Sequence, residues 1–251
     1  MSDTSSLPVA SEGLRIGKVL SRSFTVLVRS FPKYILFGAI MALPNLIQLL
    51  RYGSASDFNL GRHESRGESL AFALLSFVLY ALCQSVMIYG AFQDIRGRPF
   101  DLGASISRGF RRFFPVLGTS FCFGFVIVLG LALFILPGLI ILTMYLVAVP
   151  VCVVEGLGPV RSLDRSRLLT KGHRWKIFAI YLAPIVPIVV VMFVLIFIGS
   201  VVAGATGSII VAYLGSALFS ASEAIVTIVT YHDLRAAKEG LDIEQLAAVF
   251  D

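Results

Sequence analysis

The sequence predicts an all-α, polytopic membrane protein: a helical bundle with six transmembrane helices in three pseudo-repeats. Three observations predict it: an excess of apolar over charged residues, long stretches without any charge, and a one-sided distribution of basic residues. The chain of 251 residues is 57% hydrophobic and only 14% charged, whereas soluble domains are about one quarter charged. Because so few polar residues cannot cover a soluble protein, we expect the excess apolar side chains to face lipid.

Four stretches of the chain contain no Asp, Glu, Lys, Arg or His, and an ionised group is unfavourable at the bilayer centre. These stretches are residues 34–50, 69–93, 113–154 and 177–222. A transmembrane helix needs about 20 residues, so the last two stretches hold two spans each. Turns at Leu136-Pro137-Gly138 and at 203–208 divide them. The predicted spans are residues 34–51, 69–92, 115–135, 138–154, 177–202 and 208–231, with a kink expected at Pro184 and Pro187.

The basic residues predict the orientation of these spans. All but three of the 21 Lys and Arg residues lie on the side of the two termini, the exceptions being Arg51, Arg62 and Arg66. Basic residues gather on the cytoplasmic side, so we expect both termini in the cytoplasm. Residues 1–13 are expected to form a disordered tail, 14–235 the membrane domain and 236–251 a cytoplasmic tail. No apolar core of a cleaved signal peptide is found within residues 1–33.

A short motif recurs before each predicted pair of spans. Residues 16–24 resemble residues 102–110, and 163–166 are a weaker third copy. The chain therefore divides into three units, each an amphipathic helix followed by two spans. The copies place one arginine at the same position, and Arg22, Arg108 and Arg165 are candidate contacts for anionic lipid head groups or another anion. The alternative is that these helices only fix the topology.

Glu223 is the one acidic residue well inside a predicted span, and Gln84 lies at the same predicted depth in the second span. The acid belongs to a polar stripe on one helix face, made of Ser216, Ser220, Glu223, Thr227 and Thr230. Lipid offers no hydrogen-bond partners, so the stripe should face other helices, with Gln84 as the first expected partner of Glu223. The pair forms either an ion or substrate path or a helix–helix contact, and the sequence leaves both open.

No motif of an enzyme or of a metal site is found. The chain lacks a phosphate-binding loop, a nucleophile elbow and the zinc-protease helix motif. The histidines and cysteines show no ligand spacing; they are His63, His173, His232, Cys83, Cys122 and Cys152. We therefore expect no catalytic residue, no metal and no cofactor. The net charge of +6 comes from basic residues at the ends of the spans, where they are explained by orientation in the membrane. It therefore does not indicate nucleic-acid binding.

Several motifs resemble those of a known family. They are Leu136-Pro137-Gly138, Val149-Pro150 and the segments 154–159, 162–166, 169–175, 231–235 and 238–242. With them the chain resembles the glycerophosphodiester phosphodiesterase membrane-domain family and related uncharacterised bacterial inner-membrane proteins. The resemblance implies a bundle of about six helices in the bacterial cytoplasmic membrane.

Some members of this family carry the membrane bundle fused to a phosphodiesterase barrel. This sequence ends at Asp251 without that barrel, so we do not expect the hydrolytic activity. The motif positions Glu155, Arg165 and Ser166 match residues of this chain. Glu155 is expected either to pair with Arg165 or to cap the helix that follows.

These features predict a membrane protein of unknown molecular activity, acting as a non-enzymatic scaffold or accessory domain. One alternative is a small transporter or lipid-handling protein with Glu223 and Gln84 in its path, and another is a regulator whose arginines sense anionic lipid. A cavity that reaches Glu223 would favour the transporter, and a dry, packed bundle the scaffold. The lipid bilayer is the expected partner, nucleic acid is not, and the sequence leaves a protein partner or a second copy of the chain open.

Overall fold

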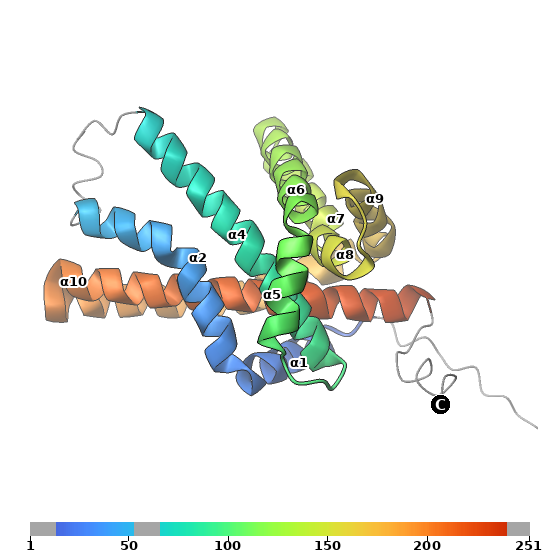
Figure 1. Ribbon diagram of the computed structural model, residues 1–251, viewed down its shortest axis with the longest axis horizontal. Helices are drawn as coiled ribbons and strands as arrows, with labels where there is room; N and C mark the ends of the chain where they lie inside the picture. Colours follow the sequence, from blue (N-terminus) through green and yellow to red (C-terminus); the bar gives the residue numbers. More distant parts are fainter. Residues whose placement is uncertain (1–13, 53–65, 240–251) are drawn as a thin grey trace, which may run out of the picture.

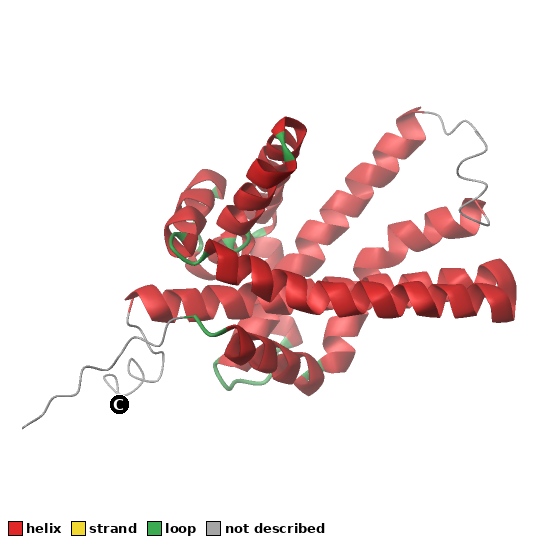
Figure 2. Cartoon of the chain, turned by 180° about the vertical axis from the view of Figure 1, so that it is seen from behind, coloured by secondary structure: helices red, strands yellow, loops and turns green. Residues whose placement is uncertain are grey.

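The structure, a computed structural model, describes residues 14–52 and 66–239, and in these residues it contains helices and loops but no strand (Figure 1 and Figure 2). The helices are α1 (Ile16–Arg29), α2 (Phe31–Tyr52), α4 (Arg66–Ile95), α5 (Leu102–Arg111), α6 (Phe113–Leu133), α7 (Ile135–Tyr145), α8 (Ala148–Glu155), α9 (Pro159–Thr170) and α10 (Arg174–Glu239). The predicted all-helical class is thus confirmed. The expected tails, 1–13 and most of 236–251, and His63 lie outside the described residues.

Four of the segments are long and apolar enough to cross a bilayer. They are Leu70–Ile95, Phe113–Leu133, Ile135–Glu155 and Arg174–Glu239. A fifth crossing is obtained if α1 and residues Phe31–Pro44, which meet at 88°, are counted together. The most apolar stretch of α10 is not covered by the rest of the protein. Such a surface is suited to lipid rather than to water.

The longest helix, α10, folds back on itself and is a hairpin. Its 66 residues would form a rod of roughly 100 Å if straight, but Ala203 and Gly204 leave the helical conformation, with φ +60° at Gly204. A Cβ on Gly207 would lie 2.3 Å from the carbonyl oxygen of Gly199, and one on Gly215 would meet the sulfur of Met192. The first arm (174–202) and the second arm (205–239) are therefore antiparallel, and the turn expected at 203–208 is present.

The chain also reverses between α6 and α7, but earlier than the sequence predicts. The break is at Phe134, whose φ of −164° and ψ of 156° are extended. Pro137 instead lies in the first turn of α7, where its missing N–H is not needed by the helix. A Cβ on Gly130 would approach the Cα of Gly138 to 3.1 Å. The glycine that was expected to form the turn therefore allows the two helices to pack closely.

The three segments expected to be amphipathic helices lie in α1, α5 and α9. The chain turns sharply from α1 into α2 at Ser30. On α1 the side chain of Phe24 is 68% exposed, and on α5 that of Phe110 is 67% exposed. Exposed apolar side chains on short amphipathic helices are typical of helices that lie in a membrane interface.

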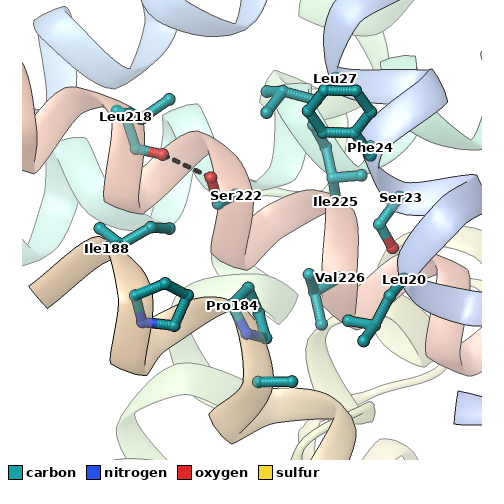
Figure 3. Close-up of a pocket in the computed structure, with 12 residues that line it drawn as sticks. Leu20, Ser23, Phe24, Leu27, Pro184, Ile188, Leu218, Ser222, Ile225 and Val226 are labelled. Carbon is teal, nitrogen blue, oxygen red and sulfur yellow. Dashed lines mark hydrogen bonds between the residues drawn. The ribbon is translucent and has the colours of Figure 1, made fainter. Parts of the chain in front are cut away.

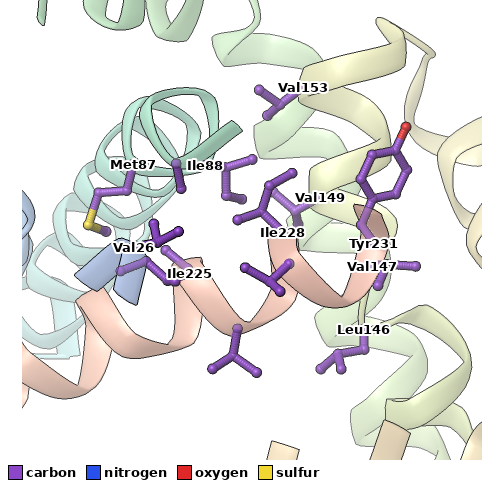
Figure 4. Close-up of a cluster of buried hydrophobic side chains, with 14 of the residues drawn as sticks. Val26, Met87, Ile88, Leu146, Val147, Val149, Val153, Ile225, Ile228 and Tyr231 are labelled. Carbon is purple, nitrogen blue, oxygen red and sulfur yellow. The ribbon is translucent and has the colours of Figure 1, made fainter. Parts of the chain in front are cut away.

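The hydrophobic core lies where α1, α4 and α8 pack around the second arm of α10. Figure 4 shows Ile225 and Ile228 of α10 between Met87 of α4 and Val149 of α8. All four side chains are buried. Figure 1 shows that α2, α4 and α6 extend away from this region in different directions. The packed region thus fixes the helices at one end, and the candidate site begins where they separate.

Candidate functional site

Glu223 lies on the second arm of α10 and receives a hydrogen bond from α4. The hydroxyl of Tyr80 donates to Oε1 of Glu223 at 3.2 Å. The expected partner, Gln84, is one helical turn away from Tyr80, and its own buried Oε1 has no hydrogen-bond partner in the described chain. The prediction therefore identified the right helix but the wrong residue. Equal depth cannot decide between residues one turn apart, because a rise of 5.4 Å is within the reach of a long side chain.

A cavity of about 380 Å³, here called the Glu223 cavity, opens beside this hydrogen bond. Residues from α2, α4 and α10 line it: Met41, Ala42, Ser76, Phe77, Tyr80, Ser216, Phe219, Ser220 and Glu223. Ser216, Ser220 and Glu223 are members of the polar stripe predicted on the sixth span, and they do face other helices. Within the described chain, no cation forms an ion pair with Glu223.

The polar side of α4 could have been found from the sequence. Ser76, Tyr80 and Gln84 recur at every fourth position, so they share one face of the helix. Ser76 and Tyr80 line the Glu223 cavity, whereas Gln84 lies deeper in the packed region, 3% exposed. The spacing of polar residues was thus a better signal for the partner of Glu223 than predicted depth.

On the other side of the second arm lies an apolar cavity, also of about 380 Å³, between α1 and the two arms of α10. Figure 3 shows Leu20, Ser23 and Phe24 of α1 facing Pro184 on the first arm and Val226 on the second. A void of only about 10 Å³, lined by Tyr181, Phe219 and Glu223 among others, lies between the two cavities. Glu223 therefore borders both the void and its own cavity, but it does not line the apolar cavity.

A network of charged side chains fixes the last turns of α10. Arg165 of α9 donates to Glu155, at the end of α8, at 3.2 Å, and also binds Glu239. Arg235 donates to Glu239 at 2.8 Å, and the hydroxyl of Tyr231 donates to Glu155 at 2.9 Å. Of the two roles expected for Glu155, pairing with Arg165 and capping the following helix, the pairing is thus present.

The charges of this network stabilise one another. Burial raises the pKa of Glu239, but the hydrogen bonds from Arg235 and Arg165 outweigh burial and hold that pKa below its ordinary value. Burial lowers the pKa of Arg165, but its bonds to Glu239 and Glu155 outweigh this effect and raise the pKa above its ordinary value. Both Glu239 and Arg165 therefore stay ionised near neutral pH.

The other two candidate arginines have different surroundings. Arg22 of α1 lies 3.3 Å from Asp233 of α10 and also donates to the carbonyl oxygen of Ile95 at 3.4 Å. The guanidinium of Arg108 lies over the ring of Tyr89, at 5.7 Å, and its Nε has no hydrogen-bond partner in the described chain. Two of the three arginines thus have carboxylate partners within the protein, and contact with lipid head groups stays a prediction.

No group of three or more His, Cys, Asp or Glu side chains that could hold a metal ion occurs in the described residues. No family model matches the chain, and neither does any curated protein or solved structure with which it was compared. The resemblance to the phosphodiesterase membrane-domain family therefore stays a prediction from the sequence.

Proposed function

We propose that this chain is a six-span bundle of the bacterial cytoplasmic membrane, with both termini in the cytoplasm, that handles a small ligand as a transporter or a lipid-handling protein. The observation that carries the proposal is the cavity of about 380 Å³ that reaches Glu223. Small-molecule pockets in proteins have volumes from roughly 300 Å³ upward. Acidic residues within transmembrane bundles are typical of substrate or ion paths. A catalytic step is not part of the proposal.

The arrangement into three repeats is supported by burial. Each of the helices α1, α5 and α9 precedes a pair of longer helices, the third pair being the two arms of α10. The position three residues before the shared arginine is occupied by Val19, Ser105 and Ser162, and these side chains are all fully buried. Four residues later, Ser23, Gly109 and Ser166 are also buried. Each copy thus packs the same face of its short helix against the bundle, as repeats of one unit would.

The proposal is tested by the reactivity of single cysteines in α4. Ser76 lines the Glu223 cavity, whereas Ser85 of the same helix is fully buried. In a background in which Cys83, Cys122 and Cys152 are replaced, we expect Ser76→Cys to react with N-ethylmaleimide in the folded, detergent-solubilised protein. Ser85→Cys is the matched control and should react only after unfolding. Mass spectrometry measures the extent of alkylation.

An unreactive Ser76→Cys would mean that the cavity is closed to small molecules, and it would favour a scaffold without a ligand. Ser220→Cys, on the opposite wall of the cavity, provides a second reporter if Ser76→Cys does not fold. Monodisperse elution of each variant in detergent is the measure of folding.

A further inference from the structure

Within the part of the chain that the structure describes, the acidic group of the Glu223 cavity lacks a charged partner. The described residues that line the cavity include no Lys, Arg or His, and the hydrogen bond to Glu223 comes from a neutral phenol. By contrast, Glu155, Glu239 and Asp233 each lie within ion-pair distance of an arginine. A carboxylate removed from water is strongly disfavoured unless a counter-charge is close. The cavity therefore offers a negative charge that a ligand would neutralise.

The hydroxyl groups around this acid already donate their hydrogens within the protein. Ser76 donates to the carbonyl oxygen of Phe72 at 2.8 Å. Ser216 and Ser220 donate to carbonyl oxygens of their own helix at 2.8 and 2.9 Å. The hydrogen of Tyr80 is taken by Glu223. A hydroxyl group has one hydrogen and two lone pairs, so these side chains present only acceptors to a ligand.

The rest of the lining is aromatic and apolar. Phe77 of α4 and Phe219 of α10 add two rings to that of Tyr80, and Met41 of α2 adds a thioether. Aromatic faces attract cations, most of all where water is excluded. A single inorganic ion would leave most of about 380 Å³ unfilled. The size of the cavity thus favours a ligand with a carbon skeleton.

From these three features, and resting on the function proposed above, we infer that the Glu223 cavity binds an organic monocation with N–H donors and a small apolar body, such as an alkyl- or arylalkylammonium ion. Its ammonium group donates to Oε2 of Glu223 and to the lone pairs of the serine hydroxyls. Its apolar body packs against Phe77 and Phe219. The cavity is therefore selective for charge, because an anion meets only acceptors and a neutral molecule leaves the carboxylate without a counter-charge.

The inference is tested by protection of Ser76→Cys from alkylation, using probes of similar size. The probes are phenethylammonium, the neutral 2-phenylethanol, the anionic 3-phenylpropionate, and sodium or potassium ions. We expect phenethylammonium to slow alkylation at a concentration at least about 30-fold below that needed for any other probe, since an unpaired buried charge disfavours a complex by 2 kcal/mol or more. Equal protection by the alcohol, the carboxylate or the inorganic ions, or no protection by any probe, would overturn the inference.

Glu223→Gln, introduced into the Ser76→Cys protein, provides the second arm of the experiment. The amide keeps the shape of the side chain but removes its charge, so protection by phenethylammonium should weaken by roughly 30-fold or more. Glu239→Gln, the same change on the same helix, lies outside the cavity and should leave protection unchanged. Retained protection in Glu223→Gln would contradict the inference. If Ser76→Cys does not react even without a probe, the proposed function itself fails, so the two failures are distinct.

Discussion

The second arm of α10 carries two glutamates, Glu223 and Glu239, with opposite surroundings. Glu239 binds two arginines, Arg165 and Arg235, and connects α10 to α9. Glu223 binds one neutral hydroxyl and borders a cavity. The same side chain on the same helix is thus fully paired at one end and left without a counter-ion in the middle.

This difference distinguishes residues that stabilise the fold from residues that are available to bind a ligand. A carboxylate already bound to arginines has its charge compensated within the protein, and removing a partner leaves that charge uncompensated. A carboxylate beside a cavity contributes little to packing and can bind what enters. Charge substitutions near Glu239 should therefore act on stability, and those at Glu223 on ligand binding.

The largest effect on stability should come from the close contact between α2 and α10, beside the Glu223 cavity. A Cβ on Gly38 of α2 would lie 2.3 Å from the carbonyl oxygen of Ala217 on α10, where neither backbone can give way. Gly38→Ala should therefore destabilise the bundle by about 3 kcal/mol. Gly124→Ala on α6, with no atom within 4 Å of the added carbon, is the control and should cause no loss. Thermal unfolding in detergent measures both, and equal midpoints would show that α2 and α10 are not in close contact.

A smaller effect is expected when the charge network is broken. Arg165→Ala leaves Glu155 without its cation, and the side chains concerned are 29% and 16% exposed. We expect a loss of about 2 kcal/mol, less than for a fully buried pair because of this exposure. Glu223→Gln should change the same unfolding midpoint little, because Tyr80 can donate equally to an amide oxygen. A larger loss in Glu223→Gln than in Arg165→Ala would reverse the comparison between the two glutamates.

The smallest effect is a dependence on pH at Glu239. Its pKa is lower in the folded protein than the ordinary value of 4.5, so its contribution to stability is complete above that pH and is lost as the pH falls through the lower, folded pKa. The free energy of unfolding of the wild type should therefore exceed that of Glu239→Gln by less than about 1 kcal/mol at pH 7, and this difference should shrink below pH 4.5 and disappear once the pH is below the folded pKa. A difference that grows on acidification would contradict the assigned ion pairs.

Much of the fold can be predicted from the distribution of charge along the chain, because lipid excludes charged residues from whole helical segments and not only from single positions. The hairpin of α10 was predicted at 203–208 and occurs at Ala203 and Gly204. The turn between α6 and α7 was placed at Pro137 but occurs at Phe134. A proline marks either a turn or a helix start, and packing of Gly130 against Gly138 decides between them. Six crossings in three repeats stay a proposal.

The side-chain partners were less predictable, because they depend on how helices rotate about their axes. Arg22 looks like a free surface charge in the sequence, yet it meets Asp233, 211 residues further along the chain. Arg165 meets Glu239 in addition to Glu155, the partner expected from the motif. Tyr80 was missed because an aromatic residue in an apolar span resembles a lipid-facing one. No feature of the sequence predicts the Glu223 cavity, because it forms where α2, α4 and α10 separate.

Two prolines on the first arm of α10 affect how the bundle bends. Pro184 and Pro187 line the apolar cavity, and neither has an N–H to bond the carbonyl group four residues earlier. Bending at this point therefore breaks fewer helical hydrogen bonds than bending elsewhere on the arm. We expect flexure of the arm to be concentrated within this turn, next to the void of about 10 Å³ that lies between the apolar cavity and the Glu223 cavity. The void that borders Glu223 thus adjoins the proline-containing turn of the first arm.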